Sequence, residues 1–201
     1  MPSRLTLDWN CIVELEQKQA QAPFILQLVE AHRSKQIEVA LLAASASENA
    51  RSKLFPGNAE VFKQKIAHVG LADLPLVPMP AIAGLSYWDF AYYVGDEENY
   101  EEQFGKLWEI IAPKVGREIA DHLPEGHPID DEAIQSERLA KWRNAWCDVM
   151  SAYCHIRYKR DCFVTNNTKD FQRNEPQLLR LGMQRILNPK EACREFVSRT
   201  R

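Results

Sequence analysis

"DCFVTNNTKDF", residues 161–171, is the stretch on which the interpretation of this chain turns. Its first five residues, Asp161 to Thr165, favour a β-strand, and a group of polar residues follows directly. A strand that ends in this way either leads into a plain turn or forms the rim of a site. The residues at the ends of the other predicted strands separate these two interpretations.

Strand-like and helix-like segments alternate along the rest of the chain. Short apolar runs predict strands at 4–8, 36–45, 161–167 and 183–189. Apolar residues at helical spacing predict helices directly after the first strand and at 22–35, 141–159 and 176–182. This alternation predicts an α/β fold with three layers, in which helices cover both faces of a central parallel sheet.

The middle of the chain has a different composition. Between Asp73 and Gly105 there is no Lys or Arg, but there are seven acidic residues and a dense set of aromatic residues. Three prolines within 74–84 allow at most an edge strand or an extended connector. A helix over 100–123 is expected to break at Pro113. We therefore expect one domain over 1–201, with a mainly helical, aromatic-rich insertion at roughly 74–137.

Composition and cysteine usage indicate an ordinary globular protein of the cytoplasm. Of the 201 residues, 45% are hydrophobic and 26% are charged, which is typical of a chain with a normal core. No apolar stretch is long enough to span a membrane, and no signal peptide is expected at the amino terminus. The five cysteines are odd in number, widely spaced and without a CxxC pair, which favours a reduced compartment.

The net charge of −3 is unevenly distributed. Residues 138–201 hold 14 Lys or Arg against 6 Asp or Glu, whereas the first 137 residues hold 11 against 22. A basic third of this kind suits a polyanion such as RNA that contacts one face only. Six basic residues near the predicted rim are candidates for contacts with an RNA backbone: Arg143, Arg157, Lys159, Arg160, Lys169 and Arg173.

Several common kinds of catalytic site are absent from the sequence. There is no GxSxG, no GxxxxGK[ST], no GxGxxG and no HExxH, and the five histidines are scattered. Phosphatases with an aspartyl nucleophile place a second Asp two residues after the first, and here Asn10 follows Asp8 at that spacing. These absences leave the acidic residues near the strand ends as the main candidates for chemistry.

Four acids are candidates for one shared site. Asp8 ends the first predicted strand, Glu48 follows the second, Asp148 lies in the helix before "DCFVTNN", and Asp170 follows that strand. Each alone is more typical of a helix cap or a solvated charge. Together they would repel one another unless a cation lies between them, and oxygen ligands suit Mg²⁺ or Mn²⁺. Such ions support the hydrolysis of phosphodiesters.

The same segments resemble a known family, the PIN-domain nucleases. "LTLDWNCIVELE", residues 5–16, is similar to the family's opening strand and Asp-x-Asn. "ASASENAR", residues 44–51, is similar to its second acidic segment, and "MQRILNP", residues 183–189, to its last strand. "CDVMSAYCHIRYKRDCFVTNNTKDF", residues 147–171, resembles the C-terminal block of the family. The closest resemblance is to VapC-type toxin ribonucleases of bacterial toxin–antitoxin pairs.

The resemblance implies a hydrolase that cleaves RNA as an endoribonuclease. It implies that Asp8, Glu48 and Asp148 are catalytic and, with Asp170, bind Mg²⁺ or Mn²⁺. Thr165 is implied as a further catalytic residue, and a last group would support the acids and the phosphate: Asn10, Asn166 and Asn167. Asn167 stands where many members carry an Asp, so Asn167 and Asp170 are alternatives for the fourth position of the site.

Partners follow from the same resemblance, and a second function class stays open. The family implies RNA as substrate, an antitoxin or another protein as partner, and a homodimer as one assembly. The alternative is a PIN-like module without catalysis, which binds RNA or a protein through the insertion at 74–137. Asn167 and the acidic insertion favour this alternative. Cleavage of RNA, or binding without cleavage, distinguishes the two classes.

Overall fold

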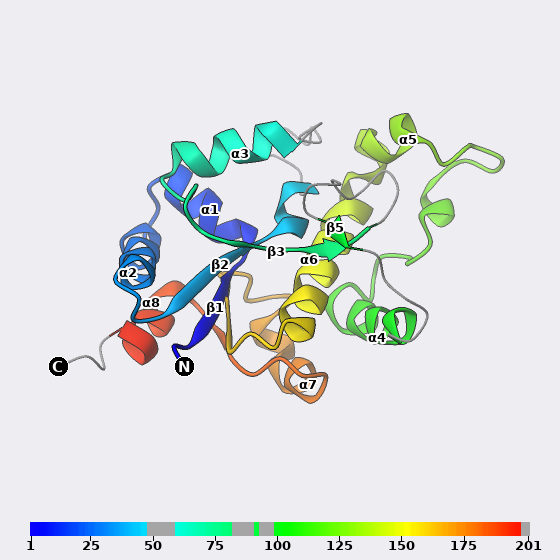
Figure 1. Cartoon of the computed structure of the whole chain (residues 1–201). Helices are drawn as coiled ribbons and strands as arrows, with labels where there is room; N and C mark the ends of the chain where they lie inside the picture. Colours follow the sequence, from blue (N-terminus) through cyan, green and yellow to red (C-terminus); the bar gives the residue numbers. More distant parts are fainter. Residues whose placement is uncertain (48–58, 82–90, 93–98, 198–201) are drawn as a thin grey trace.

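A sheet of five parallel strands forms the centre of the protein. The computed structural model describes residues 1–47, 59–81, 91–92 and 99–197 (Figure 1). The strand order is β3-β2-β1-β6-β7, and every pair of neighbours is parallel. The bounds are β1 (Arg4–Leu7), β2 (Glu38–Leu42), β3 (Leu76–Val77), β6 (Cys162–Val164) and β7 (Ile186–Leu187). The predicted α/β class and parallel central sheet are therefore confirmed.

The strands are apolar on both faces, as parallel strands between two helical layers must be. Alternate residues of β1, β2 and β6 divide between two cores. Leu5, Val39 and Cys162 belong to one core, and their chain neighbours Ala40 and Phe163 belong to the other. Because side chains alternate along a strand, this division places one core on each face of the sheet.

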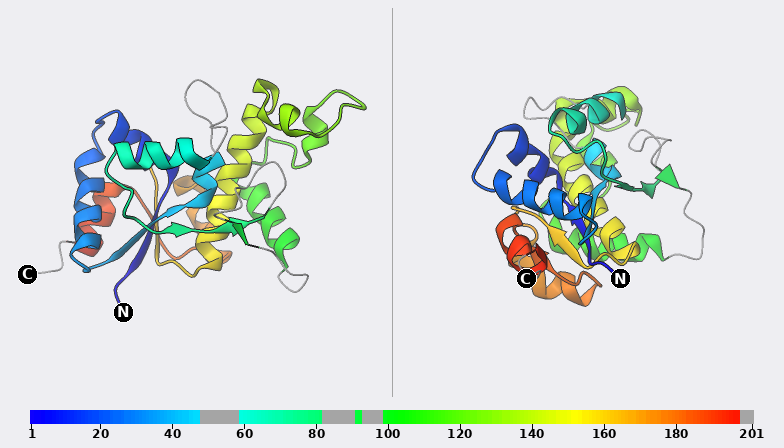
Figure 2. Two further views of the ribbon diagram at one scale, coloured as in Figure 1. Left: turned by 45° about the horizontal axis from the view of Figure 1, so that its top comes forward. Right: turned by 60° about the vertical axis from the view of Figure 1, so that its left-hand side comes forward.

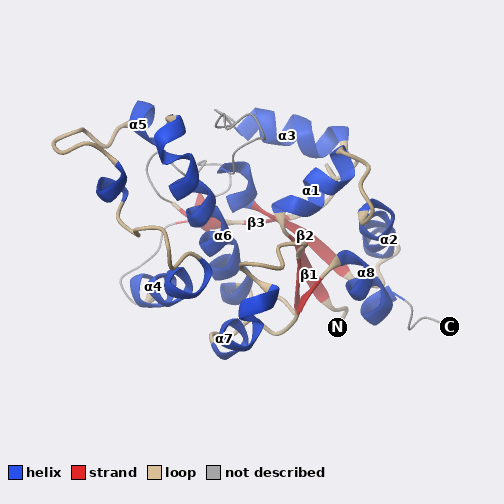
Figure 3. Ribbon diagram, turned by 180° about the vertical axis from the view of Figure 1, so that it is seen from behind, coloured by secondary structure: helices blue, strands red, loops and turns tan. Residues whose placement is uncertain are grey.

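Helices cover both faces and give the three layers seen in Figures 1 and 3. The first layer contributes to the core around Leu5 and Val39 and consists of α1 (Trp9–Glu16), α2 (Ala22–Arg33), α3 (Ala59–His68), α8 (Pro189–Ala192) and η7 (Cys193–Val197). The other layer contributes to the core around Phe163 and consists of α4 (Tyr100–Ile111), α6 (Ala140–Arg157) and α7 (Glu175–Arg180), which follows η6 (Gln172–Asn174).

The segment predicted as an insertion contributes both to the central sheet and to the helical layer that contains α4, α6 and α7. β3 at its start is the edge strand of the sheet, which is one of the two forms that its prolines allow. A separate two-stranded parallel pair follows, β4 (Met79–Pro80) with β5 (Ala91–Tyr92). α4 then packs along α6 and ends at Ile111, just before the predicted break at Pro113.

A projecting segment, here called the arm, connects α4 to α6. It spans residues 113–139 and contains η4 (Ile119–His122), α5 (Asp131–Gln135) and η5 (Glu137–Leu139). Figure 2 shows the arm, coloured yellow-green, extending beyond the amino-terminal end of α6.

Among the residues that the structure describes, no helix has the length and apolar character needed to cross a bilayer.

The strand order places a change of direction at the middle of the sheet. From β1 the chain builds outward to β2 and β3, and it then returns to the other side of β1 to form β6 and β7. In open parallel sheets, ligands bind beyond the carboxyl ends of the strands at this switch point. The carboxyl ends of β1 and β6 therefore mark the place to look for a site.

Candidate functional site

Asp8 and Thr165 lie side by side at the switch point. Asp8 directly follows β1, and Thr165 directly follows β6. The parallel register pairs Leu7 with Val164, and the amide of Asp8 donates to the carbonyl of Val164 at 3.0 Å. Two residues that are far apart in the sequence are thus brought together by backbone pairing alone, before any side chain contributes.

The carboxylate of Asp8 is buried and held by three donors. Only 2% of the residue is exposed. Its Oδ1 accepts from the backbone amide of Trp9 at 2.8 Å, which caps α1. Its Oδ2 accepts from the hydroxyl of Thr165 at 2.7 Å and from the side-chain amide of Asn10. The orientation of Asp8 is therefore fixed by both strand ends at once.

Thr165 is the centre of this network. Besides donating to Asp8, its Oγ1 accepts from Asn10 Nδ2 at 2.9 Å and from the backbone amide of Asn167 at 2.9 Å. Asn10 completes the connection, because its Oδ1 accepts from the backbone amide of Asn166 at 3.0 Å. The predicted supporting residue Asn10 thus links the turn after β1 to the turn after β6.

Asp170 is held by Asn167. The side-chain amide of Asn167 donates to Asp170 Oδ2 at 3.0 Å, and its Oδ1 accepts from the backbone amide of Asp170 at 3.1 Å. Both ends of the Asn167 side chain are therefore occupied by Asp170. Of the two alternatives for the fourth position, Asp170 is the carboxylate, and Asn167 fixes where it lies.

Asp148 comes from the middle of α6 and is half-buried. Within the described ranges, no hydrogen bond or ion pair to its carboxylate is present. Burial raises the pKa of Asp148 well above its ordinary value, and the negative charges of Asp8 and Asp170 raise it further. Three acids from separate parts of the sequence are thus close enough for their charges to interact.

The pKa of Asp8 is also perturbed. Burial raises it from the ordinary value of 3.8 to about 6, although the hydrogen bonds from Thr165, Trp9 and Asn10 act in the opposite direction. Desolvation of the carboxylate therefore outweighs three donors that favour its charged form. A buried acid with a raised pKa beside other acids is typical of functional sites.

A divalent cation fits the chemistry of these residues. Asp8, Asp148 and Asp170 supply carboxylate oxygens, which Mg²⁺ and Mn²⁺ accept as ligands, and no basic group offsets the charge of Asp148 in the described structure. Among the described residues, no three acidic, His or Cys side chains form a group tight enough to hold a metal ion directly. Glu48, the fourth predicted ligand, lies outside the described residues.

Two buried polar groups near the strand ends have no hydrogen-bond partner in the described structure, and only the second of them, Asn166, was a candidate from the sequence. Ser45 lies in η1 (Ala43–Ser47), directly beyond β2, and its buried hydroxyl has no hydrogen-bond partner. The side-chain amide of Asn166 is also buried without a partner. The position of Ser45 after a predicted strand is a signal in the sequence, but its lack of a partner becomes visible only in the structure.

The protein was compared with protein-family models, curated proteins and solved structures. None of the three comparisons finds a match. The family resemblance of residues 5–16, 44–51, 147–171 and 183–189 therefore stays a prediction from the sequence.

Proposed function

We propose that the protein is a metal-dependent endoribonuclease built on a PIN-like domain. Two features support the proposal. Asp8 and Thr165, which belong to two of the segments that resemble the family's motifs, meet at the switch point of a parallel sheet. The surrounding side chains form one connected hydrogen-bond network rather than separate helix caps.

The observation that carries the proposal is the state of Asp148. A partly buried carboxylate is costly unless it is paired or hydrogen-bonded. In the described structure, the carboxylate of Asp148 has no hydrogen-bond donor and no ion-pair partner. The charged groups that act on its pKa there, Asp8 and Asp170, are also acids. A purely structural role gives no reason to keep such a group, whereas a bound cation does.

Asp8, Asp148 and Asp170 would hold the cation partly through bound waters, since the three do not form a direct ligand group within the described residues, and Glu48 is a further candidate ligand. A divalent ion held by these residues would supply an activated water and would offset charge that develops on the phosphodiester. Thr165 and Asn10 keep the carboxylate of Asp8 in one orientation, and Asn167 does the same for Asp170. The side-chain amide of Asn166 is buried without a partner, so it would reach a phosphate oxygen only after its side chain turns toward the solvent.

The candidates for RNA contact are narrowed by the structure. Arg143 is fully buried and donates to the carbonyls of Ile134 and Ser136. Arg160 is 5% exposed and bonds Glu38 and the carbonyl of Leu5, at the amino-terminal edge of the sheet. These two predicted contacts are therefore unsuited to RNA at the site. Lys169 and Arg173 are exposed in and after the turn that holds Asp170, so they are the better candidates.

A second function is favoured by one observation. The tight metal-binding group that a fully formed site would present is absent from the described residues. The alternative is therefore a PIN-like module that binds RNA or a protein without cleaving RNA. It shares the fold with the first proposal and differs from it in chemistry.

Incubation of a labelled single-stranded RNA with the full chain tests the proposal. We expect cleavage with Mn²⁺ or Mg²⁺, no cleavage with EDTA, and a loss of at least about a hundredfold in Asp8→Asn and Asp148→Asn, since removing one electrostatic group from a site costs rates on this order. Asp73→Asn is the matched control, because Asp73 is an exposed acid paired with Arg33 away from the site.

Two outcomes are decisive. Cleavage that persists in EDTA and in both site variants would overturn the metal-dependent nuclease. Binding of the RNA without cleavage under any metal condition would support the module instead. In either case the Asp73→Asn protein should behave like the unchanged chain.

A further inference from the structure

A pocket of about 400 Å³ lies between α4, α6 and the arm. Aromatic rings of the two helices line it, including Phe104, Trp108, Trp142 and Trp146. The rings are in contact, with centroids 6.0 Å apart for Phe104 and Trp108 and 6.2 Å apart for Trp108 and Trp142. This volume is in the range of sites that bind a ligand or a side chain of another molecule.

The walls of this pocket are fixed by hydrogen bonds. The indole N–H of Trp108 donates to the carbonyl of Val115 at 2.7 Å, and that of Trp142 donates to the carbonyl of Arg117 at 2.9 Å. Both bonds tie the first part of the arm to the helices beneath it. The pocket is therefore a preformed feature, which reduces the entropy lost when it is filled.

An exposed apolar side chain stands at the pocket. Ile129 belongs to the arm, lines the pocket and is 52% exposed. Single exposed apolar residues are common on proteins and need no explanation. Here the exposed side chain adjoins a preformed aromatic cavity, and this combination is typical of a binding site for an apolar anchor.

The charge around the pocket limits what it can bind. Glu101 and Glu118 line it together with Arg117, which pairs with both of them. Over residues 100–139 there are ten Asp or Glu against four Lys or Arg. RNA and other phosphate ligands are repelled by such a surface, whereas a basic partner is attracted.

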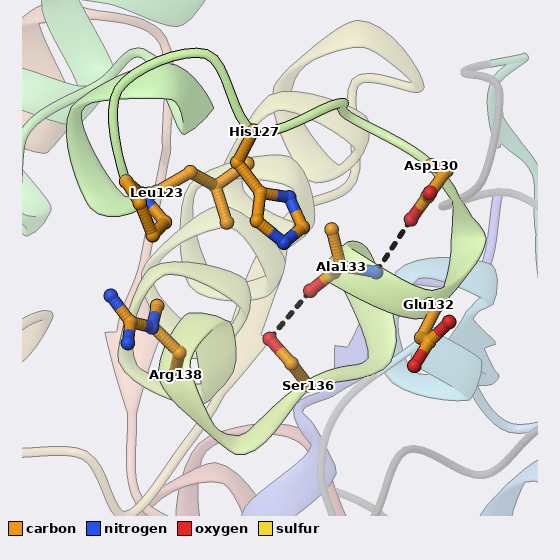
Figure 4. Close-up of a pocket in the computed structure, with 8 residues that line it drawn as sticks. Leu123, His127, Asp130, Glu132, Ala133, Ser136 and Arg138 are labelled. Carbon is orange, nitrogen blue, oxygen red and sulfur yellow. Dashed lines mark hydrogen bonds between the residues drawn. The ribbon is translucent and has the colours of Figure 1, made fainter.

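The acidic character continues on the other side of α5. A smaller pocket of about 260 Å³ is shown in Figure 4. Asp130 and Glu132 lie on one side of it and Arg138 on the other. Asp130 also caps α5 by accepting from the backbone amide of Ala133 at 2.8 Å. Asp130 and Glu132 thus add two acids of the arm to those that line the aromatic pocket.

We propose that the aromatic pocket is the docking site for a basic segment of a partner protein, with one apolar side chain inserted between α4, α6 and the arm. The apolar anchor fills the cavity beside Ile129, and neighbouring Lys or Arg residues of the partner face Glu101 and Glu118. This surface is separate from Asp8 and Thr165, so the inference does not depend on the proposed nuclease activity.

Selection of a random library of short peptides displayed on phage, with the full chain as bait, tests this inference. We expect enriched peptides to combine one large apolar residue with several Lys or Arg. A synthetic copy of an enriched peptide should bind less tightly in high salt, because exposed charges are then screened. The affinity is measured by the fluorescence anisotropy of a dye attached to the peptide. Its affinity should fall by about tenfold or more in Ile129→Ser, as expected on loss of an anchor contact.

Variants separate this surface from other exposed groups. Glu118→Lys should weaken the same peptide, since it reverses a charge at the pocket. Leu26→Ser is the matched control, because Leu26 is also 52% exposed but lies on α2, in the other helical layer. Enriched peptides that are acidic, or that bind equally well to all three variants, would overturn the inference. The inference would also be overturned if the unchanged chain self-associates and Ile129→Ser converts it to a monomer. The pocket would then be filled by a second copy of this chain and not by a partner protein.

Discussion

Thr165 uses its whole hydrogen-bonding capacity within the candidate site. A hydroxyl offers one donor and two acceptor positions, and here Asp8, Asn10 and the amide of Asn167 occupy all three. The residue touches the acid and both turns, and it is fully buried. We assign it a positioning role, in which it acts through Asp8.

Replacing the hydroxyl tests this role. Thr165→Val keeps the shape but leaves Asp8, Asn10 and Asn167 each without one partner, so we expect a loss of about 1–3 kcal/mol in the free energy of unfolding. Thr165→Ser should restore most of this loss. Urea denaturation in EDTA measures the stability of both. Equal stability of Thr165→Val and the unchanged chain would contradict the network.

Asp148 leads to the opposite expectation. Its raised pKa means that the metal-free fold disfavours the charged form, so Asp148→Asn should stabilise the protein at neutral pH. The same variant should be inactive in RNA cleavage. Thermal unfolding in EDTA provides the measurement.

A control of opposite sign accompanies this prediction. Arg33 holds the pKa of Asp73 down, to about 2, so Asp73→Asn should leave stability unchanged or slightly lower. If Asp148→Asn instead lowers the free energy of unfolding as much as a typical core substitution does, the carboxylate of Asp148 has a stabilising partner in the fold.

The residues of the site were easier to predict than their contacts. Asp8, Asn10 and Thr165 stand at predicted strand ends, and the structure joins them directly. That Asn167 holds Asp170 was not predictable, because Asn at such a position serves equally well as a ligand or as a turn residue. The placement of Glu48 remains a prediction.

At the scale of elements, the periodic segments were predictable and the pairings were not. The predicted strand at 36–45 exists, but it ends at Leu42 and continues as the 3₁₀ turn η1. The strand predicted at 161–167 is regular only over Cys162–Val164. Beyond β6, the backbone amides of Asn166 and Asn167 donate to the side chains of Asn10 and Thr165 instead of continuing the sheet ladder. β4 and β5 pair although each has only two residues, a length too short to give a recognisable strand pattern in the sequence.

Gly182 illustrates how one residue ends an element. It follows α7 with φ of +113°, in the left-handed region, and an added Cβ would lie 3.0 Å from Cγ2 of Ile156. Gly182→Ala should therefore lower the free energy of unfolding by about 1 kcal/mol or more. Urea denaturation measures it, with Gly126→Ala as control, because that glycine has φ of +75° but open space around it. Equal losses would show that backbone conformation alone matters.

At the scale of the whole molecule, two buried groups oppose each other as pH changes. His155 is buried against Thr6, and burial lowers its pKa from 6.5 to about 3. Its contribution to stability is present above pH 6.5 and is lost on acidification. Asp8 has a raised pKa, so its contribution is present at low pH and is lost as pH rises through about 6.

This opposition gives a pH-dependent prediction. Between about pH 6 and pH 4, the metal-free chain gains stability from Asp8 while it loses stability from His155. Asp8→Asn removes the gain, so its urea midpoint should fall more steeply on acidification than that of the unchanged chain. Parallel midpoints for the two proteins would contradict the assignment of pKa values.

Cation binding should depend on the same groups. If Mn²⁺ binds the ionised carboxylates, it should raise the melting temperature at neutral pH and much less at about pH 5, where Asp8 is protonated. Asp148→Asn should abolish the shift at neutral pH. This readout needs no RNA, so it separates the cation site from the nuclease activity.

The site is assembled from the beginning and the last third of the chain, which has a consequence for synthesis. The ribosome delivers residues from the amino terminus, so β1, β2 and β3 are available while β6 is still being made. Until residues 162–165 arrive, Asp8 lacks the hydroxyl of Thr165 and one side of β1 is an open edge. Under the proposed function, an unfinished chain is therefore inactive toward the messenger RNA on which it is being made.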